Sequence, residues 1–142
     1  MNWMNPEDYI TDHFQVKEAL FLPRWGLLHN PTPTQKTNII ATANAMEEVR
    51  ALFDRPIKVH CWIRPLHADT SHPVNNRSKA RQFDGRDYNA LVNGAAGSQH
   101  IYGRAVDFHV IGMKVSEATK IILPHLERID IRMEKHDGLW IH

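Results

Sequence analysis

The sequence predicts an α+β fold with a small, mostly antiparallel sheet and helices packed on one face of it. Three observations support this prediction. Apolar residues recur at helical spacing over residues 33–53, β-branched and aromatic residues gather at residues 57–63 and 104–110, and an Asp-Gly pair near the end is typical of a hairpin turn. The length of 142 residues suits a single domain over residues 1–142.

Composition excludes several classes of protein. Hydrophobic residues make up 42% and charged residues 23% of the chain, as in globular domains. The net charge is +1 and the basic residues are spread along the sequence, so we expect no nucleic-acid partner. No apolar run reaches the length of a transmembrane segment, and the first residues lack the pattern of a secretory signal. We therefore expect a monomer that is cytoplasmic as synthesised.

The single cysteine, Cys61, excludes an internal disulfide and a cluster of thiolates within one chain. A metal site in this chain is therefore expected to use His, Asp or Glu ligands. Cys61 itself is expected to be a small buried residue.

The N-terminal third predicts two helices separated by a loop. Asn5-Pro6, followed by acidic residues, indicates a short first helix, which could be broken before residues 14–20. Residues 21–33 are rich in Pro and Gly and predict a loop. Thr32-Pro33-Thr34-Gln35 is a capping-box pattern that begins a long helix. An apolar stripe on this helix is expected to face the core; it comprises Ile39, Ala43, Met46, Val49 and Phe53.

Two strands follow, separated by a long polar segment. Residues 57–63 predict the first strand, which Arg64-Pro65 closes. Residues 66–87 form a loop of a length that is usually functional or disordered, and residues 88–92 a helical turn. Residues 104–110 predict the second strand. Its alternation places Ala105, Asp107 and His109 on one face and Val106, Phe108 and Val110 on the other.

The C-terminal part predicts a helix and a hairpin. Residues 115–126 are helical, with a disturbance near Pro124. Residues 129–134 and 139–142 predict two strands that turn at residues 135–138.

Three residues on these elements form a possible metal set. His100, Asp107 and His142 match the composition of a three-ligand catalytic zinc site, and Glu134 on the preceding strand could act as general base. The spacing alone is not a specific metal pattern. His100 could instead be a loop hydrogen bonder, Asp107 an edge-strand charge and His142 a terminal residue.

The motif SQHIYGRAVDF at residues 98–108 matches the S-x-H-x-x-G-x-A-x-D signature of the zinc D-alanyl-D-alanine carboxypeptidase family. That family includes phage L-alanyl-D-glutamate endolysins and shares its fold with the Hedgehog signalling domain. The resemblance extends to VHCWIR, to YNALVNGAAGSQH and to EKHDGLWIH, and covers roughly residues 40–142. It implies a Hedgehog/DD-peptidase-like fold with Zn²⁺ as cofactor.

The resemblance also implies a role for each motif residue. His100, Asp107 and His142 would bind zinc. Glu134 would activate water, and Arg64 would hold a substrate carboxylate, for which its guanidinium fork is suited.

Three features differ from the pattern of the relatives. Glu134 and His142 are eight residues apart, whereas relatives often have six or fewer, so Asp137 and His136 are rivals for the base. Trp140 stands where some relatives carry a second active-site histidine. The sequence ends at His142, where relatives usually continue the strand.

Ser98 and Trp140 are expected on the substrate side of the site, although Ser98 could equally be a loop cap. The resemblance implies a zinc metallopeptidase that cleaves peptidoglycan stem peptides, of the D-alanyl-D-alanine carboxypeptidase type. One alternative is an endolysin-type L-alanyl-D-glutamate endopeptidase of phage origin, which would be released to the cell wall at lysis. The other is a non-catalytic, zinc-stabilised binding domain.

Overall fold

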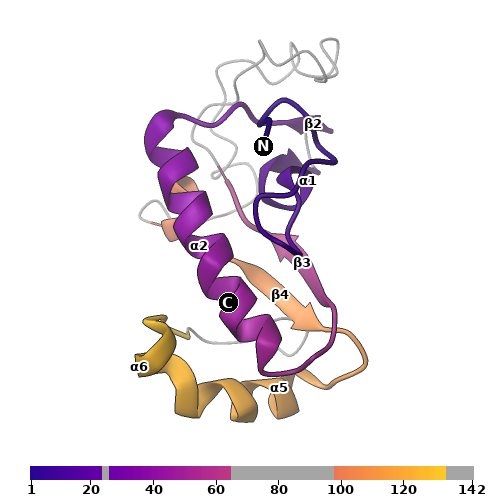
Figure 1. The fold of residues 1–142 in the computed structure, drawn as a ribbon, viewed down its shortest axis with the longest axis vertical. Coiled ribbons are helices and arrows are strands. Elements are labelled where there is room, and N and C mark those ends of the chain that lie inside the picture. Colours follow the sequence, from indigo (N-terminus) through magenta and orange to yellow (C-terminus); the bar gives the residue numbers. More distant parts are fainter. Residues whose placement is uncertain (24–25, 65–97, 134–142) are drawn as a thin grey trace.

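A computed structural model describes residues 1–23, 26–64 and 98–133 of the chain. Helices and short antiparallel strands make up the described part, which confirms the predicted α+β class (Figure 1). In chain order the elements are α1 (Val16–Leu20), β1 (Phe21–Leu22), β2 (Leu27–Leu28), α2 (Pro33–Ala51), β3 (Ile57–Cys61), the 3-10 helix η1 (Gln99–Tyr102), β4 (Asp107–Val110), α5 (Val115–Ile122), the 3-10 helix η2 (Leu123–His125) and α6 (Leu126–Ile129).

The long helix α2 begins where the capping-box pattern predicts. The Thr32 hydroxyl accepts a hydrogen bond from the Gln35 backbone N–H at 3.2 Å, and the Gln35 side-chain oxygen accepts one from the Thr32 N–H at 2.9 Å. These two bonds satisfy N–H groups that a helix start leaves without a partner. The predicted apolar stripe is buried along the helix.

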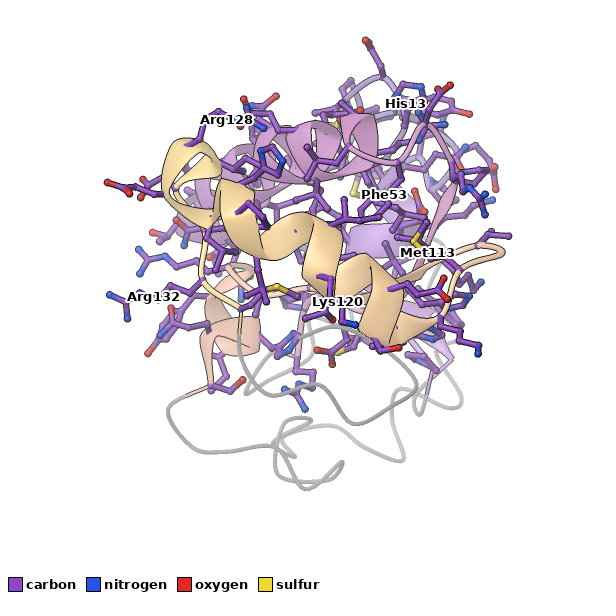
Figure 2. All side chains as sticks on the ribbon, turned by 90° about the horizontal axis from the view of Figure 1, so that it is seen from below. His13, Phe53, Met113, Lys120, Arg128 and Arg132 are labelled. Atoms are coloured by element: carbon purple, nitrogen blue, oxygen red, sulfur yellow. The ribbon has the colours of Figure 1, made fainter. Side chains whose placement is uncertain are left out.

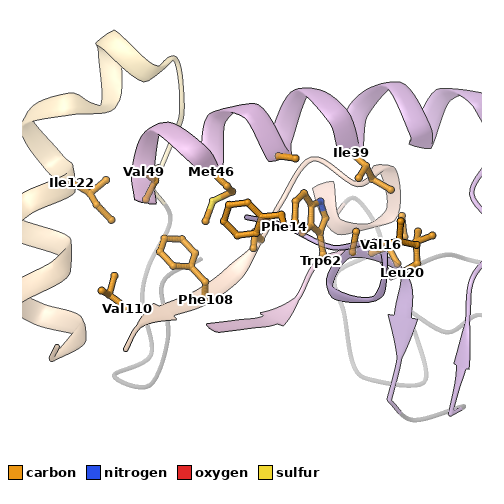
Figure 3. Packing of buried hydrophobic residues seen from close by; sticks show 14 of the residues in the cluster. Phe14, Val16, Leu20, Ile39, Met46, Val49, Trp62, Phe108, Val110 and Ile122 are labelled. Atoms are coloured by element: carbon orange, nitrogen blue, oxygen red, sulfur yellow. The ribbon is translucent and has the colours of Figure 1, made fainter. Parts of the chain in front are cut away.

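Helix α2 crosses one face of the β3–β4 pair, and the core fills the space between them (Figure 3). Phe108 and Val110 point from β4 toward Met46 and Val49 on the helix. Beyond the end of β3, the Trp62 ring meets Phe14 edge-on, with ring centroids 6.1 Å apart. The predicted alternation along β4 is therefore confirmed, because Val106, Phe108 and Val110 all belong to the core.

A bulge interrupts the pairing of β3 with β4. Val59 lies opposite Phe108, but the next paired residues are Cys61 and Asp107, so β3 has one extra residue, His60, at this point. In an uninterrupted strand Cys61 would share the core face with Val59. Directly opposed residues share a face, so the bulge brings Cys61 to the face of Asp107, away from α2.

The predicted helix at Asn5-Pro6 is wrong. Asn5 instead forms a local turn, in which its side-chain oxygen accepts from the Glu7 N–H at 3.1 Å and its side-chain amide donates to the Asp8 carboxylate at 2.7 Å. Asn is suited to such turns because its side chain can bond the backbone two residues on. The first helix of the described chain is α1, which begins at Val16.

Residues 21–33 are not only a loop, because β1 and β2 pair within them, with Phe21 opposite Leu28. The strand predicted over residues 129–134 is also wrong for its described part. Ile129 ends α6, and Asp130 adopts a left-handed conformation with a φ of 60°. The Ile131 N–H then bonds the Leu126 carbonyl at 3.0 Å, as in a Schellman motif that terminates a helix.

The helical segment at residues 115–126 is confirmed with its predicted disturbance, because Pro124 lies in η2 between α5 and α6. An end-on view shows Phe53 in the interior beneath these helices, while Arg128 and Arg132 point outward (Figure 2). None of the helices in the described part of the chain has the length and apolarity needed to cross a membrane. The predictions for residues 66–87, 88–92 and 139–142 lie outside the described residues.

Gly103 ends η1 with a φ of 76°, and a Cβ at this position would lie 2.7 Å from the Ile39 side chain on α2. Gly112 provides a matched comparison. Its φ is 80°, but a Cβ there would meet only the end of the Arg55 side chain, at 3.1 Å. Of these two glycines, only Gly103 combines a left-handed backbone with a close approach to the core.

We expect Gly103→Ala to lower the free energy of unfolding by about 1–3 kcal/mol, and by more than Gly112→Ala does. Both variants strain the backbone, but only the first also displaces Ile39. Urea unfolding of the two variants measures the difference. If both variants lost the same free energy of unfolding, the approach of residue 103 to Ile39 on α2 would not be tight.

Candidate metal site

His100 lies at the centre of the site and is fully buried. The Ser98 hydroxyl caps η1 by accepting the His100 backbone N–H at 3.2 Å. The His100 Nδ1 lies 2.7 Å from the Trp62 carbonyl oxygen. A carbonyl can only accept, so Nδ1 carries a hydrogen, and a neutral His100 has its lone pair on Nε2.

Asp107 faces this second nitrogen from the first position of β4. Its Oδ1 is 3.4 Å from His100 Nε2, and its side chain is 12% exposed. Its neighbours Val106 and Phe108 are buried in the core on the opposite face of the strand. The structure therefore brings together two of the three residues predicted to bind a metal.

The geometry of this pair fits zinc. Two ligand atoms at about 2.0–2.2 Å from a tetrahedral zinc ion lie roughly 3.3–3.5 Å apart, and the observed separation is 3.4 Å. Metal-binding histidines usually donate their other ring N–H to a carbonyl or carboxylate, as His100 does to Trp62. The neutral tautomer that this bond selects is the one that can bind a metal through Nε2.

Helix α2 holds the loop that carries His100. Three of its side chains donate to consecutive loop carbonyls: Gln35 to Ile101, Asn38 to Tyr102 and Thr42 to Gly103, each at 3.0 Å. These donors recur at helical spacing and so share one helix face. The Trp62 indole adds a fourth bond, to the Gly103 carbonyl at 3.1 Å. The position of His100 is thus fixed from two sides.

Cys61 completes a cluster that the sequence did not reveal. Its Sγ lies 3.8 Å from His100 Nδ1, and one ligand atom from each of Cys61, His100 and Asp107 lies within 4.8 Å of the others. The sequence is expected to offer only His, Asp and Glu as metal ligands, whereas in the structure a thiol lies beside His100 and Asp107. The β-bulge at His60 brings the thiol here, and no sequence signal marks that bulge.

Arg64 and Ser98 lie beside the pair. The Arg64 Nη2 donates to the Ser98 hydroxyl at 3.2 Å, and the Arg64 backbone N–H donates to the His100 carbonyl at 3.0 Å. Within the described residues, the buried Arg64 Nε has no hydrogen-bond partner. Ser98 is thus a loop cap that also orients Arg64.

A histidine pair extends the same face along the sheet. The rings of His60 and His109 stack with centroids 4.8 Å apart, and their nearest nitrogens are 2.6 Å apart. The remaining predicted site residues, Glu134, Trp140 and His142, lie outside the described residues, as do the rival bases Asp137 and His136.

Asp107 and Cys61 change the proton affinity of His100. Burial lowers the pKa of this imidazole, but the interactions with Asp107 and Cys61 outweigh burial and raise the pKa from 6.5 to about 9. Without a metal, His100 therefore keeps a proton on Nε2 to a higher pH than an ordinary histidine does. A metal ion must displace this proton in order to bind Nε2.

Comparison with known proteins yields one finding. The family model described as Peptidase M15 matches residues 13–142. Searches of curated proteins and of solved structures give no match. The family match includes β3, the η1 loop and β4, which carry the residues described above.

We expect the stabilisation by zinc to increase with pH. The pKa of His100 is raised on folding, so its proton stabilises the metal-free fold fully below pH 6.5, and this contribution is lost as the pH rises through about 9. Zinc binding requires loss of the same proton. The rise in melting temperature on adding zinc should therefore be larger at about pH 8 than at about pH 6.5. A shift that stays constant over this range would contradict protonation of His100.

Proposed function

Since the chain belongs to the Peptidase M15 family and is a zinc metallopeptidase, we propose that it hydrolyses a peptide bond in peptidoglycan stem peptides. The observation that carries the proposal is the His100–Asp107 pair, whose spacing and tautomer fit zinc. The family resemblance implies the other groups that hydrolysis needs: Glu134 as the general base and Arg64 as the group that binds the substrate carboxylate.

In this proposal His100, Asp107 and His142 hold the zinc ion. Zinc, when bound, polarises the scissile carbonyl and makes water more acidic. Glu134 takes the proton from the attacking water and passes it to the leaving amine. Asp137 adjoins Gly138, a pair suited to a turn, so Asp137 more naturally serves the backbone.

Arg64 binds a substrate carboxylate in this proposal. Its Nη2 is anchored by Ser98, which fixes the guanidinium plane. Its buried Nε has no partner among the described residues, and a buried N–H without a partner costs about 1–3 kcal/mol. A carboxylate that accepts from this N–H removes the cost and gains a charge-assisted bond. Ser98 and Trp140 border the substrate.

The finer assignment is removal of the terminal D-alanine from a stem peptide that ends in D-alanyl-D-alanine. A carboxypeptidase must recognise the free carboxylate of its substrate, which is the role proposed for Arg64. Cleavage of the L-alanyl-D-glutamate bond is the alternative within the same family resemblance.

Mass spectrometry of muropeptides after digestion of purified peptidoglycan tests the proposal. We expect products shortened by one D-alanine. Glu134→Gln should keep its zinc but lose about 10²–10⁴ in rate, and Asp137→Asn should remain nearly normal. Cleavage after L-alanine would support the endopeptidase alternative, and absence of any product would contradict hydrolysis of peptidoglycan.

We expect Arg64→Lys to lower kcat/KM by about 10–100-fold, because a point charge cannot replace the two-pronged geometry. Its zinc content should be unchanged. Arg55→Lys is the matched control, since Arg55 is exposed and donates to the Gly112 carbonyl in the turn that follows β4. Steady-state kinetics on a peptide with a free carboxylate measure the effect. If the Arg64→Lys enzyme had the same kinetics as Arg55→Lys, Arg64 would not bind the substrate carboxylate as proposed.

A further inference from the structure

Cys61 occupies a position that ordinary core packing does not explain. It is only half-buried, whereas the next two residues, Trp62 and Ile63, are buried in the core. The bulge at His60 places it opposite Asp107, on the sheet face that α2 does not cover. Its sulfur touches the edge of the His100 ring at 3.8 Å from Nδ1.

We propose that Cys61 is a zinc ligand in this chain, in addition to the residues that the family resemblance implies. The inference rests on the proposed function only in that His100 and Asp107 hold the metal. Zinc binds thiolates well, and a Cys–His–Asp combination lies within its normal range of ligands.

The distances allow this role with one local change. In a tetrahedral site, a sulfur at about 2.3 Å and a nitrogen or oxygen at about 2.0–2.2 Å from zinc lie roughly 3.5–3.7 Å apart. The three ligand atoms of the cluster lie within 4.8 Å of one another. The Cys61 sulfur lies 3.8 Å from Nδ1, the ring nitrogen that would not bind the metal, so it must move toward Nε2, and a cysteine χ1 rotation allows such a movement.

The direction of the movement follows from His100. Its Nδ1 already donates to the Trp62 carbonyl, so the metal must bind at Nε2, on the side of Asp107. The Cys61 sulfur therefore has to turn from the Nδ1 edge of the ring toward Asp107, its cross-strand partner. The thiol gives its proton to solvent as it binds.

A cysteine ligand would change the number of protein ligands that zinc has in this site. Catalytic zinc sites usually have three protein ligands and one open position, whereas sites with four protein ligands are closed and structural. With His142 as the third ligand, Cys61 would be the fourth. The resting site would then be closed, so Cys61 would have to leave the zinc ion before water can bind for the proposed hydrolysis.

Cobalt substitution tests the proposal without measuring activity. Co²⁺ replaces zinc in the full chain, and a thiolate ligand gives an intense near-ultraviolet charge-transfer band that nitrogen and oxygen ligands do not give. We expect this band at one equivalent of Co²⁺ in the wild type and its loss in Cys61→Ser. The weaker visible bands of bound cobalt should persist in the variant, because His100 and Asp107 remain.

Zinc affinity provides the second measurement. Loss of a residue that only supports a ligand typically costs about 10–100-fold in affinity, so loss of a direct ligand should cost at least about tenfold. Cys61→Ala serves beside Cys61→Ser, and circular dichroism establishes that both fold. In the wild type, zinc should also protect Cys61 from alkylation by iodoacetamide, which needs no variant.

The outcomes separate this inference from the proposed function. Cobalt binding in the wild type without a charge-transfer band, with equal zinc affinity in Cys61→Ser, would overturn the role of Cys61 and leave the His100–Asp107 site intact. Failure of the wild type to bind cobalt or zinc at all would overturn both. If neither variant folds, alkylation of the wild type at equal rates with and without zinc would overturn the role of Cys61.

Discussion

The hydrogen bond from His100 Nδ1 to the Trp62 carbonyl, at 2.7 Å, is the interaction on which the site depends. It joins the η1 loop to the residue that follows β3, across a sequence gap of 38 residues. It selects the neutral tautomer whose Nε2 faces Asp107. The Trp62 indole returns a bond to the Gly103 carbonyl, so one core tryptophan positions both the ring and the end of the loop that carries it.

Much of this arrangement could be predicted from local sequence. The start of α2 follows from a capping box that satisfies its own N–H groups, and the two faces of β4 follow from alternation. Gly103 is required by a left-handed backbone against Ile39. The His100–Asp107 pair is implied by the family resemblance of the S-x-H-x-x-G-x-A-x-D motif, because the spacing alone is not a specific metal pattern; the structure places the two residues on a 3-10 helix and on the strand that follows it.

Other features could not be predicted, because they depend on contacts between distant segments. The bulge at His60 changes the face on which Cys61 lies, and it exists only in the pairing of β3 with β4. Asn5 has the residue type of a helix cap, but its side chain forms hydrogen bonds to Glu7 and Asp8 in a local turn. Residues 129–133 alternate like a strand, yet Ile129 and Ile131 pack against the core from the end of a helix.

Anomalous diffraction at the zinc absorption edge, on crystals grown with zinc, tests the central claim most directly. The account predicts a zinc peak at about 2.0–2.2 Å from both His100 Nε2 and an Asp107 oxygen, with the His100–Trp62 hydrogen bond preserved. A zinc ion bound through His100 Nδ1, or held at the His60–His109 pair with His100 and Asp107 unoccupied, would contradict it.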